Sequence, residues 1–207
     1  MKKLCMLLLA LLYIEALQAQ EFKVGVFTGM NVSSPSKLNS QVGFNVGAKG
    51  ELSFSNNLFL DLGLSLTSKG WESDSYYDGT TQKTQKWKAT PYYLEIPVHV
   101  GYKVSVGENI KLLGSVGPYV GLGLFGKNTY TMETGNKTTE TTSDNLFKDK
   151  LQERFDWGVG ARLGVELYNH YQLSLGYNLG LKHIYKKEQN QIDSKNRVFD
   201  VSFAYMF

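Results

Sequence analysis

Apolar and polar residues alternate along most of this 207-residue chain. In the clearest stretch, residues 58–67, leucine occupies every second position, and Phe, Asp, Gly, Ser and Thr fill the positions between. Side chains of a strand point to opposite faces in turn, so this period of two predicts a β-strand and excludes an amphipathic helix. The same alternation predicts eight strands, at residues 23–31, 42–54, 58–67, 92–103, 111–125, 154–168, 171–182 and 196–207.

The last of these segments, residues 196–207, carries aromatic and branched residues on one face and ends on phenylalanine. An amphipathic strand of this kind resembles the C-terminal assembly signal of bacterial outer-membrane β-barrel proteins. Under this hypothesis the residues that form the signal are Phe203, Tyr205 and Phe207. We also expect this strand to close a barrel by pairing with the first strand near Val24 and Val26.

The connections between the predicted strands alternate between long and short. Residues 55–57, 105–109 and 169–170 make short turns, whereas 68–90 and 126–153 are long segments. Strands of about ten residues, short periplasmic turns and long outer loops are typical of outer-membrane barrels. The pattern therefore predicts an all-β fold, an eight-stranded antiparallel up-and-down transmembrane β-barrel with short periplasmic turns and long extracellular loops. Pro97 interrupts the fourth strand, and we expect a β-bulge there.

Alternation alone does not decide which face lies inside, because a soluble eight-stranded barrel would bury the apolar face. The polar face is rich in glycine, which suits a crowded interior. Tyr and Trp, among them Tyr92 and Tyr93, gather near strand ends, where we expect the aromatic girdles of the membrane interface. The charges of the polar face also balance, as a buried network requires. These three features favour the membrane barrel. The charged residues of the polar face are Lys23, Lys49, Lys103, Arg154, Arg162 and Lys182, with Glu51, Asp61, Glu95, Asp156, Glu166 and Asp200.

An eight-stranded barrel has an interior that side chains can just fill. We therefore expect the charged residues of the polar face to plug the lumen. His99 belongs to the same face, and we expect it to join the network as a hydrogen-bonded residue rather than act as a general base.

Residues 1–19 combine Lys2 and Lys3 with an apolar run and a small residue at position 19, which predicts a cleaved signal peptide. The mature domain is then 20–207, and it contains no cysteine because Cys5 is removed with the signal. The formal net charge of the whole chain is +3 and falls to +2 once two lysines and one glutamate are removed. Without a basic cluster, the chain lacks the electrostatic pattern of a nucleic-acid-binding protein.

Chemical motifs are weak. No cluster has the spacing of metal ligands, and no glycine-rich loop predicts a cofactor. Lipid-modifying membrane barrels place a serine nucleophile beside a histidine base. This sequence offers only Ser65 with His99, without a supporting motif, so we predict no catalytic residues.

Both long segments contain turn dipeptides, Asp78-Gly79 and Gly135-Asn136, flanked by residues suited to strands. They predict β-ribbons that protrude beyond the membrane and expose an edge for strand addition by a partner. The alternative is that 68–90 and 126–153 are simple solvated loops.

Four motifs, FKVGVFTGMN, YLEIPVHVGYK, GPYVGLGLFG and FAYMF, resemble the PorT-like family of outer-membrane β-barrels. The overall plan is also similar to the OmpX-type barrel. The resemblance implies a barrel in the bacterial outer membrane. We expect a monomer whose partners are the membrane lipids and the barrel-assembly machinery. We expect a non-enzymatic structural or surface-interaction role through the long loops. The alternatives are a component of secretion or transport and, third, a lipid-modifying enzyme.

Overall fold

The computed structural model describes residues 21–36, 38–54, 57–135, 137–144, 146–147, 152–184 and 194–207. The predicted signal peptide, residues 1–19, lies outside the described residues. The described residues contain no helix long and apolar enough to cross a membrane. The strands are β1 (Glu21–Ser33), β2 (Asn39–Ser53), β3 (Leu58–Ser68), β4 (Trp71–Glu72), β5 (Tyr76–Asp78), β6 (Lys83–Gly107), β7 (Ile110–Thr134), β8 (Lys137–Ser143), β9 (Phe155–Leu167), β10 (Tyr171–His183) and β11 (Lys195–Met206).

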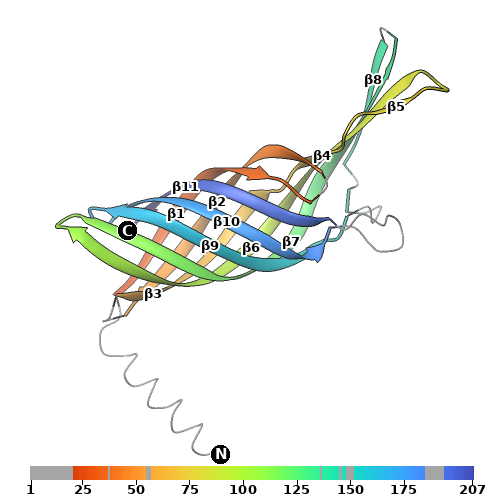
Figure 1. Cartoon of the computed structure of the whole chain (residues 1–207). Coiled ribbons are helices and arrows are strands. Elements are labelled where there is room, and N and C mark those ends of the chain that lie inside the picture. The colour runs from red at the N-terminus through yellow and green to blue at the C-terminus, as the bar shows by residue number, and fades with distance from the viewer. Residues whose placement is uncertain are drawn as a thin grey trace, which may run out of the picture.

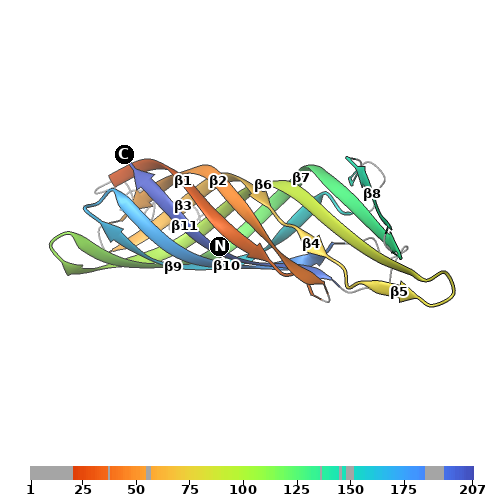
Figure 2. The same ribbon diagram turned by 90° about the horizontal axis from the view of Figure 1, so that it is seen from above.

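Eight of these strands form a closed antiparallel ring in the order β1, β2, β3, β6, β7, β9, β10 and β11 (Figures 1 and 2). β11 closes the ring on β1, with Val26 opposite Tyr205, and the N–H of Phe207 donates to the carbonyl of Val24. The predicted fold class and the predicted closure near Val24 and Val26 are therefore confirmed.

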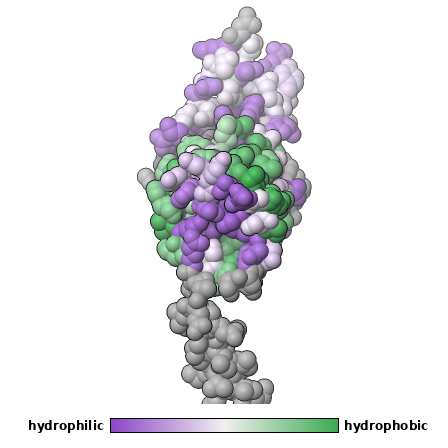
Figure 3. Space-filling model, turned by 90° about the vertical axis from the view of Figure 1, so that its left-hand side faces the viewer, coloured by the Kyte–Doolittle hydropathy of each residue, from purple (hydrophilic) through white to green (hydrophobic). Residues whose placement is uncertain are grey.

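The barrel strands expose their apolar faces and bury their polar faces. Along β3, the alternate leucines Leu62 and Leu64 are half exposed, whereas Asp61 before them and Ser65 after them are buried. The other barrel strands repeat this pattern. Figure 3 views the end of the barrel that carries the short turns, where hydrophilic residues gather in the middle and hydrophobic residues cover the sides. An apolar exterior around a polar interior is the arrangement of a transmembrane barrel.

The β-bulge expected at Pro97 is absent from the described ladders, so that prediction was wrong. The register of β6 with β3 and with β7 is the same on both sides of Pro97. The register with β7 shifts instead between Tyr92 and Tyr93, where Leu124 is the extra residue. Leu124 and Phe125 consequently both point outward, and this break in the alternation is the local signature of a bulge.

β6 and β7 are each 25 residues long and continue past the barrel as a ribbon. β5 pairs with the outer part of β6, and β8 pairs with the outer part of β7. The result is a four-stranded sheet that projects from the end opposite the chain terminus at Phe207 (Figures 1 and 2). Long connections of this kind mark the extracellular end of outer-membrane barrels.

Candidate functional site

Three charge clusters fill the lumen, and the outermost is centred on Lys69. This residue follows β3 and has no exposed surface. Its ammonium group lies 2.5 Å from Oε1 of Glu95 on β6 and 2.7 Å from Oδ2 of Asp156 on β9. It also lies over the ring of Tyr119, 4.5 Å from the centroid. A buried lysine is tolerated only with such pairing, so this cluster ties three parts of the wall together.

The middle cluster is centred on Asp61. Lys49 donates to Oδ2 of Asp61 at 2.8 Å, and Arg162 approaches the same oxygen at 4.0 Å. His99 is buried next to Asp61 across the β3–β6 ladder. Asp200 accepts a hydrogen bond from the hydroxyl of Ser202 at 2.7 Å.

The cluster nearest the periplasm is centred on Lys103. Its ammonium group pairs with Glu51 and lies 2.5 Å from Oε2 of Glu166. The amide of Gln172 donates to Glu166 at 2.7 Å and to Glu51 at 3.1 Å. Both carboxylates are almost fully buried, and Lys103 and Gln172 each bind both of them. The other oxygen of Glu166, Oε1, lies 3.6 Å from the ammonium group of Lys111.

The structure brings all six predicted carboxylates into the lumen, but not all six predicted cations. Lys23 lies at the periplasmic rim beside the exposed Glu21, and Lys182 pairs with Glu153 near the outer end. Arg154 is exposed and donates to the carbonyl of Gly123, because it precedes β9 and reaches back over the rim. The interior gains Lys69, which the sequence pattern did not indicate, so the predicted set of lumen cations needs this correction.

An apolar cap covers the outer end of the lumen. Trp71 donates through Nε1 to Gln152 at 3.3 Å, and the amide of Gln152 donates to the hydroxyl of Tyr93 at 3.0 Å. The ring of Tyr93 meets Phe147 edge-on at 5.7 Å, and Leu146 is buried nearby with Trp71. The prediction that Tyr93 belongs to an interfacial girdle was wrong, since its side chain points inward and is 1% exposed.

Two glycines of β7 make room for this cap. A Cβ at Gly123 would lie 2.4 Å from the ring of Phe147, and one at Gly126 would lie 2.8 Å from Leu146. Below the cap, a cavity of about 20 Å³ is lined by Asn45, Thr67 and Arg162 among others. That volume suits about one water molecule, so side chains fill most of the lumen around this cavity.

The projecting sheet has an exposed aromatic face. Trp87 of β6 and Tyr130 of β7 are directly opposite, with ring centroids 5.2 Å apart. Tyr76 of β5 is opposite Gln85 on the same face and is 63% exposed. Among the described strands, β8 pairs with β7 alone, which leaves its other edge open.

The residues of the hypothetical assembly signal form an outward aromatic group at the periplasmic end. Tyr205 meets Phe207 edge-on at 5.2 Å and Tyr171 at 5.5 Å. Phe203 is stacked on Tyr171 at 6.2 Å. Their role in assembly stays a prediction.

The one candidate pair for nucleophilic catalysis, Ser65 and His99, shares no hydrogen bond among the described residues. The hydroxyl of Ser65 is within hydrogen-bond distance of Thr67 at 3.3 Å, and neither ring nitrogen of His99 has a hydrogen-bond partner. The predicted hydrogen bonding of His99 in the lumen network is therefore not seen. The same part of the chain contains no group of three or more His, Cys, Asp or Glu side chains placed to hold a metal ion.

A family model described as an outer membrane protein β-barrel domain matches residues 18–186. Neisserial surface protein A is 14% identical, with a TM-score of 0.47, and the match covers 91% of this chain and 98% of that one. Ail, the attachment invasion locus protein of Yersinia pestis, solved with a heparin analogue, is 14% identical with a TM-score of 0.44, covering 90% and 99%. OprG from Pseudomonas aeruginosa is 12% identical with a TM-score of 0.42, covering 90% and 95%. No curated protein matches the chain.

Proposed function

The chain belongs to the outer membrane protein β-barrel domain family and resides in the bacterial outer membrane, and on this premise we propose that it is a non-enzymatic surface-interaction protein. The barrel acts as a closed anchor, and the projecting sheet formed by β5 to β8 binds a partner outside the cell. The partner is a polypeptide segment that joins the sheet as an extra strand.

The open edge of β8, residues 138–142, carries this proposal. An unpaired edge presents N–H and C=O groups that another chain can pair with, and proteins usually cover or shorten such edges. Here the edge is held away from the barrel by the 25-residue strands β6 and β7. Main-chain hydrogen bonds would supply affinity, and side chains of the sheet would supply specificity.

The exposed aromatic face supports the same role. Tyr76 and Trp87 present large, exposed rings, and the half-buried ring of Tyr130 packs against Trp87. Tyr and Trp are enriched in protein interfaces because they combine apolar area with a polar group at low entropy cost. The filled lumen supports a role outside the barrel rather than transport through it.

A secretion component is the second candidate, because the same edge suits a secreted protein of the cell itself. Copurification of envelope proteins with the intact barrel would favour this candidate. A lipid-modifying enzyme has less support, since Ser65 and His99 share no hydrogen bond. Altered lipid acylation in a deletion strain would favour it.

The test removes the β7–β8 arm. Asn128 and Ser143 are directly opposite, so an Asn-Gly turn can replace residues 129–142 and close the shortened hairpin. Cells that display the intact or the armless protein are compared for binding to immobilised extracellular proteins and to proteins of their own culture medium. We expect at least one ligand that binds only the intact protein.

The matched control shortens the other arm. Tyr76 is opposite Gln85, so an Asn-Gly turn can replace residues 77–84 while β8 remains. This variant should retain strand-dependent binding. Equal binding of every ligand by the intact and armless proteins, at equal amounts of folded barrel, would contradict the proposed function.

A further inference from the structure

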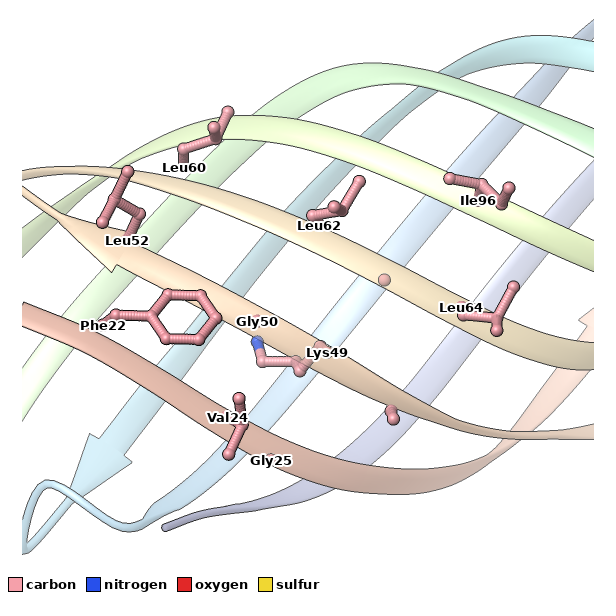
Figure 4. Close-up of a pocket in the computed structure, with 12 residues that line it drawn as sticks. Phe22, Val24, Gly25, Lys49, Gly50, Leu52, Leu60, Leu62, Leu64 and Ile96 are labelled. Atoms are coloured by element: carbon pink, nitrogen blue, oxygen red, sulfur yellow. The ribbon is translucent and has the colours of Figure 1, made fainter.

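The outer wall of the barrel contains an apolar groove over β1, β2, β3 and β6 (Figure 4). Its volume is about 630 Å³. Ala48 and Gly50 of β2 form the floor. Phe22 and Val24 border it on one side, and Leu62 and Leu64 border it on the other.

The groove exists because two successive outward positions of β2 are small. Ala48 is opposite Val26 on β1 and Leu64 on β3, and Gly50 is opposite Val24 and Leu62. The neighbouring strands therefore project larger side chains on both sides of a strand that projects almost none. Phe22 overhangs this floor, since a Cβ at Gly50 would lie 3.1 Å from its ring.

The groove lies in the periplasmic half of the membrane. It is bordered by Phe22 near the start of β1, by Leu52 near the end of β2 and by Leu60 near the start of β3. The connection between β2 and β3 is short, and short turns mark the periplasmic end. The groove is thus continuous with the lipid-facing surface and opens towards the leaflet that contains phospholipids.

We propose that this groove binds one acyl chain of a periplasmic-leaflet phospholipid and retains it longer than the convex parts of the wall retain their lipids. Lipid tails are as apolar as leucine, so hydrophobicity alone gives no preference for one part of the wall over another. Packing does give a preference, because a chain in the groove contacts protein on three sides rather than one.

A second copy of the barrel is the competing occupant, since small residues allow close contact in membranes. Its own wall is convex and carries large outward side chains such as Leu173 and Phe203, both about half exposed. Such a surface cannot follow a narrow concave groove along its length. A flexible acyl chain can.

The test uses a phosphatidylethanolamine with a photoreactive diazirine on its acyl chain, in bilayer discs that contain the mature protein. We expect labelling of Leu62 and Leu64 to exceed that of Leu173 several-fold. Leu173 is a suitable reference because it is lipid-facing and lies near the periplasmic end of β10. Native mass spectrometry of the unmodified protein should show a phospholipid that remains bound after detergent extraction.

Ala48→Leu and Gly50→Leu fill the groove from its floor and should each reduce labelling of Leu62 and Leu64 to the level at Leu173. Gly114→Leu is the matched control, because it makes the same change in a separate depression of the wall, which extends from β6 across β7 and β9 to β10 and β11. It should leave labelling of the groove unchanged. Anomalous migration of unheated protein on a denaturing gel verifies that each variant is folded.

Uniform labelling around the wall would overturn the proposal, because it would show lipids in free exchange. Crosslinks between two copies at Leu62 or Leu64 would also overturn it and would identify a dimer interface. If Gly50→Leu fails to fold, Ala48→Leu and the unmodified protein still decide between these outcomes.

Discussion

The ammonium group of Lys69 lies 2.7 Å from the carboxylate of Asp156, inside a barrel in which neither side chain is appreciably exposed. Asp156 also accepts hydrogen bonds from Asn196 at 2.9 Å and from Tyr119 at 3.3 Å. Through Asp156, strand β9 is thus bonded to three other parts of the wall directly below the cap. These are the segment that follows β3, strand β7 and strand β11.

Replacing Lys69 with methionine should destabilise the barrel by about 3–5 kcal/mol. The change keeps the length of the side chain but leaves Glu95 and Asp156 as buried charges without their cation. The free energy of unfolding in urea, measured on protein in lipid discs, tests the prediction. Lys127→Met is the matched control, because Lys127 and its partner Asp144 are both mostly exposed at 3.9 Å. That change should lower the free energy of unfolding by no more than about 1 kcal/mol.

The burial of Lys69 could not be predicted from the sequence pattern. The eight strands and their faces followed from alternation, which the membrane enforces along every strand. Lys69 follows the alternation of β3 and belongs to a run of buried residues, 68–71, that has no period. A lone lysine in a polar segment is usually solvated, so only the tertiary structure identifies it as buried.

Some of what the prediction missed was present as a weaker signal. Leu124 and Phe125 are consecutive apolar residues in an alternating strand, and they mark the bulge more directly than Pro97 does. Leu146 and Phe147 stand out in a Thr-rich polar segment, and both belong to the cap. Isolated apolar residues in a long, polar loop therefore indicate that the loop folds back and covers the end of the barrel.

Gly123→Ala should destabilise the barrel by about 1–3 kcal/mol, because the new methyl group overlaps the ring of Phe147. Phe147 is packed edge-on against Tyr93 and cannot move without disturbing the cap. Gly121→Ala, two residues earlier on the same inward face, provides the comparison. Its Cβ would lie 3.6 Å from the nearest side chains, which is an ordinary van der Waals distance. The free energy of unfolding should therefore change by no more than about 0.5 kcal/mol. Equal effects of the two changes would contradict the packing of the cap.

Deletion of Phe207 should impair assembly more than stability. Phe207 contributes an outward ring beside Tyr205 and one backbone hydrogen bond to Val24. We expect several-fold less folded protein in the outer membrane, measured as the species that migrates anomalously without heating, but normal refolding of the purified chain in detergent. Phe199→Ala, on the same face of β11, should insert normally. Normal insertion of the truncated chain would refute the assembly-signal hypothesis without affecting the fold.

Asp78 in the extracellular hairpin should titrate below the ordinary aspartate value. Its carboxylate accepts hydrogen bonds from the hydroxyl of Thr81 at 2.7 Å and the N–H of Thr80 at 2.9 Å, and these lower its pKa. A lowered pKa in the folded hairpin means that the contribution to stability is complete above about pH 3.9 and is lost as the pH falls further. The amide chemical shift of Thr80, followed by NMR, should have its midpoint below that value, and Asp78→Asn should abolish the transition. A midpoint at or above the ordinary value would contradict these hydrogen bonds.

Conductance of the purified protein in a planar bilayer tests most directly whether the barrel is a closed anchor. The cap at Trp71 and Phe147 and the clusters around Lys69, Asp61 and Lys103 fill the lumen. Folded protein should therefore give no large, steady current at any applied voltage that the bilayer tolerates. A large and steady conductance would contradict the closed lumen and favour a transport function.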